Sequence, residues 1–511
     1  MSTPWLTILI LIPLVGTAAT AFAGRKMARQ IGLAFSGATL LVCVVVALQY
    51  DVNGGWQFEE EYSWIEAFGV HYALGVDGLG LVMVLLTALL VPLVMLASWH
   101  DADDRNPASY FAWMLALESA SLAVFMATDV FLFYVVFEAT LIPAYFLIGG
   151  FGRSGRGRAA VKFLVYQLAG GLIMLGSVIG LYVVSAQAGA PSYLLSDLSA
   201  LDIDPVTQRW LFLGFFVAFA IKAPMFPVHT WLADTAAEAT PGTSVLLICV
   251  LDKIGTFGML RFCLGLLPNA SEWATPFVVV LALISIVYGA MVAIGQSDML
   301  RLIALTSLSH FGFIVLGIFV FTSQGGTGAI LYMVNHGLGT AALLLLAGYL
   351  IRRRGTASIA AYGGVEKVAP VLAGLFLIAG LAAAGLPGLS PFVSEMLVLI
   401  SAFDYAWWAG AVAVSGIVLA ALYILWLYQR AMTGPPVPEV EHFVDLNRRE
   451  VGAVAPLVLA LVLFGFYPLP LLDVINPTVD TLLTQVGVSD DGPTVEGVVI
   501  DDEQAAKGGE S

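Results

Sequence analysis

The chain has 511 residues, of which 59% are hydrophobic and only 11% charged, and its mean hydropathy is +0.92. Soluble domains carry about 25% charged residues, so this composition excludes a soluble globular protein and indicates an integral membrane protein. The formal net charge of −15 argues against a nucleic-acid partner.

Apolar runs of about 20 residues, the length that crosses ~30 Å of hydrocarbon, follow one another along the chain. They predict an all-α polytopic membrane protein with about fourteen transmembrane helices. The predicted spans lie near residues 4–23, 31–50, 78–98, 109–127, 129–150, 160–185, 210–232, 243–267, 275–295, 300–322, 327–351, 370–400, 408–431 and 451–474. The acidic stretch from Asp51 to Asp77 is predicted to be an outward loop, and the acidic tail 485–511 is expected to be disordered.

The loops between these spans separate the basic residues by side. Of the 21 Lys and Arg residues, 16 fall on one side under this count, namely Arg25, Lys26, Arg29, Arg105, Arg153, Arg156, Arg158, Lys162, Arg301, Arg352, Arg353, Arg354, Lys367, Arg430, Arg448 and Arg449. The opposite side receives Arg209, Arg261 and Lys507. By the positive-inside rule, both termini are predicted to face away from the cytoplasm.

Two spans are both long and interrupted in the middle: the seventh at APMFP, Ala223 to Pro227, and the twelfth at AGLPGLSP, Ala384 to Pro391. Broken helices at matching places in two halves indicate transporter-type inverted repeats. The predicted organisation is therefore helices 1–3 in residues 1–108, a first five-helix repeat (helices 4–8) in 109–267, a second (helices 9–13) in 275–431, and helix 14 in 451–474.

Six ionisable side chains fall near the middle of predicted spans. They are Glu138, Lys222, Lys253, His310, His336 and Glu395. A charged residue at this depth costs about 2.5–3.5 kcal/mol on insertion scales and usually marks an ion or proton path. The alternative for the carboxyls is a neutral group bonded to a neighbouring helix, and for the histidines an ordinary helix contact.

The six residues, taken in order, form a chain of titratable groups across the centre of the bundle, as lateral proton transfer requires. Water is expected to bridge the gaps between them. Glu118 and Asp252 also fall inside spans and are weaker candidates, whereas Asp129, Asp234, Glu238 and Asp298 are expected to cap helices or line loops. The sequence has no phosphate loop, haem-ligation pattern, iron–sulfur cysteines or dinucleotide fingerprint, so energy must come from a partner or an ion gradient.

Long sequence blocks in a fixed order carry a family resemblance. They are LGVDGLGLVMVLLT from Leu74, DVFLFYVVFEATLIPAYFLIG, the VHTWL block, SDMLRLIALTSLSHFGF, NHGLGTAALLLL, GLPGLSPFVSEMLVL and LFGFYPLPLLD. In these blocks the chain resembles the subunit M family of the bacterial proton-pumping NADH–quinone oxidoreductase, respiratory complex I. This family is related to the subunits of Mrp-type cation/proton antiporters. Glu395 supports subunit M, because the sibling subunits usually place a lysine on the twelfth helix.

The resemblance implies a proton-translocating membrane-arm subunit driven by quinone reduction elsewhere in the complex. It implies a Glu–Lys pair at Glu138 and Lys222, a central Lys253, relay histidines His310 and His336, and a terminal Glu395. It also implies no cofactor in this chain, with NADH, FMN, iron–sulfur clusters and quinone in partner subunits. The implied partners are the other complex I subunits, especially the neighbouring antiporter-like ones. The implied location of the chain is the bacterial inner membrane.

Two departures from the family pattern accompany the resemblance. The block from His229 to Pro241 lacks a proline and a second histidine that the family often has, and Asp252 stands directly before Lys253. Two other functions stay open at this point: an Mrp-type antiporter subunit powered by an ion gradient, and a passive scaffold whose polar residues only join helices.

Overall fold

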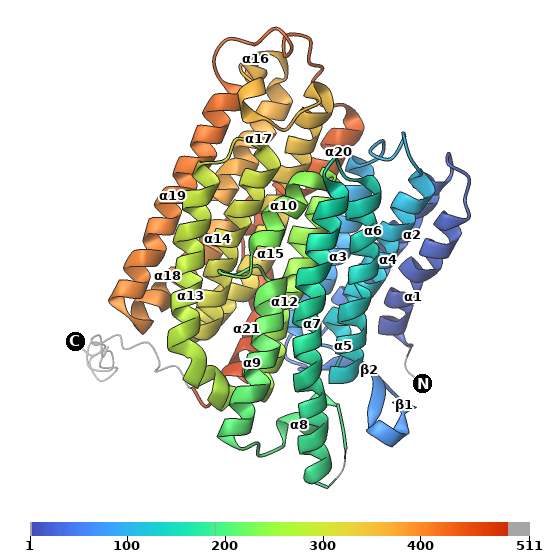
Figure 1. The fold of residues 1–511 in the computed structure, drawn as a ribbon, viewed down its shortest axis with the longest axis vertical. Helices are drawn as coiled ribbons and strands as arrows, with labels where there is room; N and C mark the ends of the chain where they lie inside the picture. The colour runs from blue at the N-terminus through green and yellow to red at the C-terminus, as the bar shows by residue number, and fades with distance from the viewer. Residues whose placement is uncertain (1–2, 190, 489–511) are drawn as a thin grey trace, which may run out of the picture.

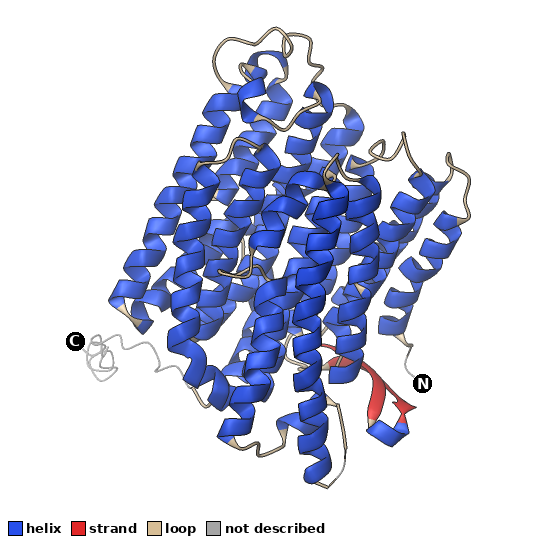
Figure 2. Cartoon of the chain, in the orientation of Figure 1, coloured by secondary structure: helices blue, strands red, loops and turns tan. Residues whose placement is uncertain are grey.

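Long helices run between two ends of the molecule, and a β-hairpin lies at one of these ends (Figures 1 and 2). The computed structural model describes residues 3–189 and 191–488. The predicted disordered tail lies outside the described residues from 489 onward.

The bounds of the helices and strands, in chain order, are as follows: α1 Trp5–Ala21, α2 Ala28–Gln49, β1 Gln57–Ile65, η1 Glu66–Phe68, β2 Val70–Val76, α3 Gly78–Ala97, α4 Pro107–Met126, α5 Val130–Ala139, α6 Leu141–Phe151, α7 Arg156–Gln187, α8 Leu195–Ser199, α9 Pro205–Lys222, α10 Thr230–Glu238, α11 Pro241–Val245, η2 Leu246–Leu251, α12 Asp252–Gly258, η3 Met259–Leu264, α13 Pro268–Ile294, α14 Met299–Phe319, α15 Ser323–Arg354, η4 Ile359–Ala361, α16 Val365–Val368, α17 Pro370–Ala383, α18 Ser390–Tyr405, α19 Trp407–Met432, α20 Arg448–Phe466 and α21 Leu469–Val486.

Within the described part of the chain, eleven helical segments are long and apolar enough to cross a membrane. The continuous pair α5–α6 counts as one of them, and so does the run from α11 to η3. The shorter α1 and the two broken pairs, α9 with α10 and α17 with α18, complete an arrangement compatible with the fourteen predicted spans. The division into inverted repeats stays a prediction.

Both predicted helix breaks are confirmed, and each has a local cause. Pro224 and Pro227 lack the N–H that a continuing helix needs, so α9 ends at Lys222 and α10 begins only at Thr230. In the second break, Gly385 and Gly388 adopt φ angles of +69° and +92°. A side chain on Cβ disfavours this left-handed region, so the chain turns there without strain only because both residues are glycine.

Several helix starts are fixed by acidic caps, because the first N–H groups of a helix have no partner within it. Asp129 accepts from Leu132 N at 2.9 Å, and Asp298 accepts from Arg301 N at 3.0 Å. The predicted capping role of both residues is therefore confirmed.

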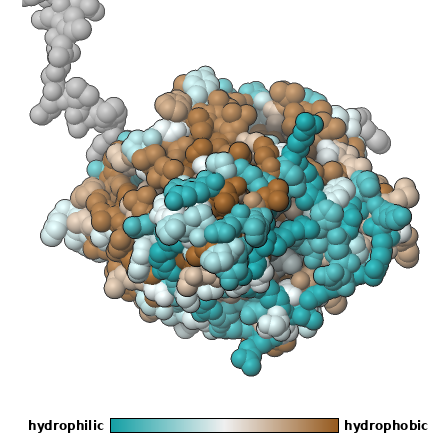
Figure 3. Space-filling model, turned by 90° about the horizontal axis from the view of Figure 1, so that it is seen from above, coloured by the Kyte–Doolittle hydropathy of each residue, from teal (hydrophilic) through white to brown (hydrophobic). Residues whose placement is uncertain are grey.

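The two ends of the bundle differ in charge. The end that carries α16 in Figure 1 contains the arginine-rich loops and is called the basic end here. Seen from above this end, hydrophilic residues spread over the centre and one side, and hydrophobic residues occupy much of the edge (Figure 3). Helix α1 begins at the opposite end (Figure 1), while the side of the membrane that each end faces stays a prediction.

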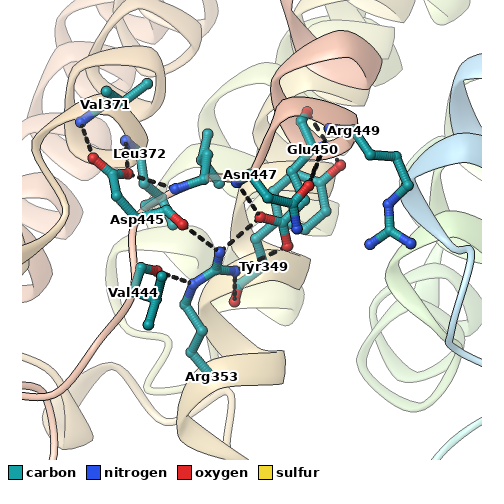
Figure 4. A network of polar contacts seen from close by, with 10 residues as sticks. Tyr349, Arg353, Val371, Leu372, Val444, Asp445, Asn447, Arg449 and Glu450 are labelled. Atoms are coloured by element: carbon teal, nitrogen blue, oxygen red, sulfur yellow. Dashed lines mark hydrogen bonds and ion pairs between the residues drawn. The ribbon is translucent and has the colours of Figure 1, made fainter.

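A polar network at the basic end joins three helices (Figure 4). Arg353, in the last turn of α15, donates to Glu450 of α20 at 2.7 Å and to the carbonyl oxygen of Val444 at 2.6 Å. Asp445 in turn accepts from the N–H groups of Val371 and Leu372 at 2.8 and 3.0 Å. These bonds fix the start of α17, the first half of the second broken helix.

The opposite end departs from the sequence prediction in three places. The acidic stretch after Asp51 contains the antiparallel hairpin β1–β2 rather than only a loop. The predicted last span ends early, because α20 stops at Phe466 and the separate helix α21 follows Pro468. The sequence predicts Arg261 in a loop on this side, yet it is buried in the π-helical segment η3 and forms an ion pair with Asp77.

Candidate functional site

Lys222 is the last residue of α9, and its side chain is 1% exposed. The C-terminal end of a helix carries partial negative charge, which favours a cation there. Its Nζ donates to Thr140 Oγ1 at 3.2 Å and lies 4.6 Å from the centre of the Phe137 ring. The helix break beside it is held by Trp231, whose Nε1 donates to the carbonyl oxygen of Ile221 at 3.0 Å.

Glu138 lies on α5, directly after Phe137 and two residues before Thr140. Its Oε1 is buried without a hydrogen-bond partner among the described residues. The carboxyl rests against α7, because a Cβ built on Gly171 would fall 1.7 Å from Oε1. Lys222 therefore contacts Phe137 and Thr140, which lie within two residues of Glu138. It donates its hydrogen bond to Thr140 rather than to the carboxyl itself.

Lys253 on α12 is fully buried and contacts His336 directly. Its Nζ lies 2.6 Å from His336 Nδ1 on α15 and 4.2 Å from the centre of the Phe311 ring. When Lys253 is an ammonium, which can only donate, Nδ1 accepts in this contact and Nε2 carries the imidazole proton. The His336 Nε2 atom has no hydrogen-bond partner among the described residues.

His310 on α14 continues the line from His336, with 5.3 Å between the ring centres. Its Nε2 lies 3.1 Å from the hydroxyl of Tyr423 on α19, and its ring lies 5.8 Å from that of Tyr332 on α15. The Tyr332 hydroxyl then donates to Glu395 Oε1 at 2.5 Å. All five side chains are at most 4% exposed.

Tyr332 and Tyr423 were not anticipated from the sequence. One signal was present, because Tyr332 precedes His336 by four residues on one helix and so shares its face. Tyr423 lies in an apolar run without a comparable pattern, and only the contact between α14 and α19 brings it to His310.

Glu395 lies in α18, after the second helix break, and the glycine-rich turn makes room for it. A Cβ built on Gly385 would fall 1.9 Å from Glu395 Oε2. The start of α18 is held from α15, where Asn335 Nδ2 donates to the carbonyl oxygen of Ser390 at 2.8 Å.

The six predicted residues thus fall into two groups. Lys253, His336, His310 and Glu395 form a line joined by hydrogen bonds and ring contacts, with the two tyrosines as members. Glu138 and Lys222 lie together around Phe137 and Thr140.

Phenylalanine rings fill the space on the opposite-end side of Lys222. Their centres lie 4.4–6.5 Å apart, and the cluster consists of Phe133, Phe137, Phe215, Phe219, Phe257 and Phe262. Phe219 precedes Lys222 by one turn of α9, so the cluster begins directly next to the lysine. In the described residues, no group of three or more His, Cys, Asp or Glu side chains is arranged to hold a metal ion.

A membrane bundle with two broken helices and a central line of buried titratable groups has the architecture of the antiporter-like membrane proteins. The family model described as NADH:quinone oxidoreductase/Mrp antiporter, TM, matches residues 127–420. NADH-quinone oxidoreductase subunit M of Mycobacterium tuberculosis is 51% identical, with 96% of each chain covered. The chain belongs to the NADH-quinone oxidoreductase subunit M family.

Solved structures agree with this assignment. A chain of respiratory complex I from Thermus thermophilus is 34% identical with a TM-score of 0.87, and the match covers 94% of this chain and all of that one. A chain of the Mrp complex from Dietzia sp. has a TM-score of 0.82 over 95% of this chain and 100% of its own length, but is only 21% identical. This second likeness is one of fold alone.

Proposed function

We propose that the chain translocates protons as a membrane-arm subunit of NADH–quinone oxidoreductase, driven by quinone reduction in other subunits. The observation that supports this most is the line from Lys253 through His336, His310 and Tyr332 to Glu395. Each member can accept or donate a proton, and each is buried where an isolated polar group is costly. A scaffold would need only satisfied contacts, whereas this line keeps His336 Nε2 without a partner in the described part of the chain.

In this proposal, Glu138 and Lys222 form the first proton site. The ammonium bonds Thr140 and the carboxyl rests against Gly171, without a hydrogen bond to one another, which is the arrangement of an opened pair. Closing the pair stabilises both charges, and opening it releases the proton of the lysine. The phenylalanine cluster supports lateral transfer, because apolar rings next to Lys222 keep water from the direct route to the opposite end.

Lys253 then receives the proton, His336 and His310 pass it on, and Glu395 is the last site before release. We further propose that the chain lies in the bacterial inner membrane with both termini on the non-cytoplasmic side. Its partners are the other complex I subunits, above all neighbouring antiporter-like ones. NADH, FMN, iron–sulfur clusters and quinone belong to those partners.

The test is proton pumping by the assembled complex in sealed vesicles. Glu138→Gln and Lys222→Ala should nearly abolish the proton gradient and the turnover coupled to it, while NADH oxidation with an artificial electron acceptor persists. Asp473→Asn, which changes a carboxyl in α21 outside the site, serves as the control. Normal gradients in both site variants would support the scaffold and refute the proposal.

A second experiment identifies the partners. The tagged chain, purified in mild detergent, should bring down subunits that contain flavin and iron–sulfur clusters. Cation-dependent proton flux by a preparation that lacks such subunits would instead indicate an antiporter powered by an ion gradient.

A further inference from the structure

Asp252 is a buried carboxyl group that the line of proton sites described above does not include. It is the first residue of α12 and directly precedes Lys253. The residue is 1% exposed, and neither carboxyl oxygen has a hydrogen-bond partner among the described residues. Buried polar groups in proteins are nearly always hydrogen-bonded, so a carboxyl kept in this state requires an explanation.

The helix that carries Asp252 is unusual in its backbone. Every residue from 242 to 264 is buried, and π-helical segments, η2 and η3, directly precede and follow α12. Single π-turns inside α-helices occur frequently at functional sites, because they rotate the side chains that follow. Here they set the orientation of the short stretch that contains both Asp252 and Lys253.

The face of α12 that bears Asp252 is turned toward the end of α9. Residues three apart on a helix share a face, and Gly255 follows Asp252 by three. A Cβ built on Gly255 would fall 2.4 Å from the backbone nitrogen of Ala223 and 2.6 Å from the carbonyl oxygen of Phe219. Asp252 therefore faces the place where α9 ends, at Lys222.

Charges on two lysines act on this carboxyl, that of Lys253 most and that of Lys222 next. Lys222 in turn lies in the field of both Glu138 and Asp252. Asp252 thus faces the end of α9 at Lys222 and directly precedes the central Lys253. Among the described residues, no hydrogen bond or ring contact joins Lys222 to Lys253.

We propose that Asp252 is a further proton-binding site, which carries protons between Lys222 and Lys253. The proposal rests on the proposed proton-translocating function of the chain. The Lys222 ammonium gives one proton to the Asp252 carboxylate, which leaves a neutral amine and a neutral acid. The acid then gives this proton to a neutral Lys253 amine, which restores the carboxylate and forms an ammonium. No electrons move, and water spans any gap wider than a hydrogen bond.

The experiment uses three variants of the assembled complex in sealed vesicles. Asp252→Asn keeps the shape but cannot carry a proton, Asp252→Leu removes the polar atoms, and Asp252→Glu keeps the acid. The native carboxyl has no hydrogen-bond partner in the described chain, so replacing it leaves no other group without a partner. The first two variants should therefore form the intact complex, as judged by a native gel. Their coupled pumping should fall at least about 10²-fold, and Asp252→Glu should restore a substantial part of it.

Lys222→Ala, measured in parallel, separates this proposal from the proposed function. Loss of pumping in Lys222→Ala together with wild-type pumping in Asp252→Asn or Asp252→Leu would overturn the role of Asp252 alone. Wild-type pumping in all of these variants would overturn both proposals. If Asp252→Asn and Asp252→Leu both fail to assemble, the carboxyl serves the fold, and its role as a proton site is likewise overturned.

Discussion

Gly171→Ala tests whether the exact place of the Glu138 carboxyl matters, without changing any titratable residue. The new Cβ would lie 1.7 Å from Glu138 Oε1, whereas non-bonded heavy atoms prefer about 3.5 Å. The carboxyl must therefore move by roughly 1.5–2 Å. Since the displaced atom ends a flexible side chain, the backbone of α7 can stay where it is.

The expected effect is large on pumping and small on stability. A displacement of about 1 Å in a catalytic group can cost about 10²-fold in rate, so coupled turnover should fall by a comparable factor. Alanine in place of glycine within a helix is itself favourable by about 0.5–1 kcal/mol. The amount of assembled complex should therefore equal that of the wild type.

Gly176→Ala is the matched control. It lies in the same helix, and a Cβ there meets no atom within 4 Å. The assay compares the proton gradient formed per NADH oxidised in vesicles of the two variants. The double variant Gly171→Ala with Glu138→Asp, whose acid is one methylene shorter, should recover part of the lost pumping. Equal pumping by Gly171→Ala and Gly176→Ala would refute the reasoning.

Three further predictions concern the tyrosines and the basic end. Tyr332→Phe deletes the 2.5 Å hydrogen bond to Glu395. Hydrogen bonds to charged groups contribute about 1.5–3 kcal/mol, so coupled turnover should fall roughly tenfold or more. Tyr62→Phe, which changes an exposed residue of the hairpin, should leave coupled turnover unchanged. Arg353→Gln leaves the buried Glu450 without its cation and should cost about 3–5 kcal/mol in thermal unfolding of the complex. Arg352→Gln loses only a long contact with Asp101, at 3.8 Å from an exposed guanidinium, and should cost less than about 1 kcal/mol. Burial raises the pKa of the Asp101 carboxyl, although Arg352 and Ser98 act to lower it, so ionisation opposes folding there. Stability should then fall as the pH rises from about 4 through the raised pKa, and Asp101→Asn should flatten this part of a melting-temperature profile.

The sequence was sufficient for the parts of the fold that depend on one stretch of chain at a time. A run of about 20 apolar residues predicts a span wherever it occurs, and proline or glycine within such a run predicts a break. Both helix breaks and the burial of Lys222 and Lys253 follow from this local chemistry. The β1–β2 hairpin was missed because consecutive glutamates hide the alternation that marks a strand.

Contacts between distant spans could not be predicted in the same way. Tyr423 and His310 are 113 residues apart, and Asp77 and Arg261 are 184 apart, so only the arrangement of the helices brings each pair together. The π-helical segments around α12 also escape prediction, because they shift backbone bonds by one residue without changing the apolar pattern.

The two groups of site residues place different demands on the proposed proton route, and this difference predicts which variants lose the most pumping. From Lys253 to Glu395, each group meets the next through a hydrogen bond or a ring contact, so a proton can pass with small movements. Between Glu138, Lys222 and Asp252, charges act on one another without such bonds, so transfer there depends on side-chain movement and water. Displacing a group in this first part lengthens a gap that nothing else spans, whereas removing one hydroxyl leaves the other tyrosine beside His310. Gly171→Ala and Asp252→Asn should therefore reduce pumping more than Tyr332→Phe or Tyr423→Phe does. The reverse order would mean that the limiting transfer lies in the part of the route that is already joined.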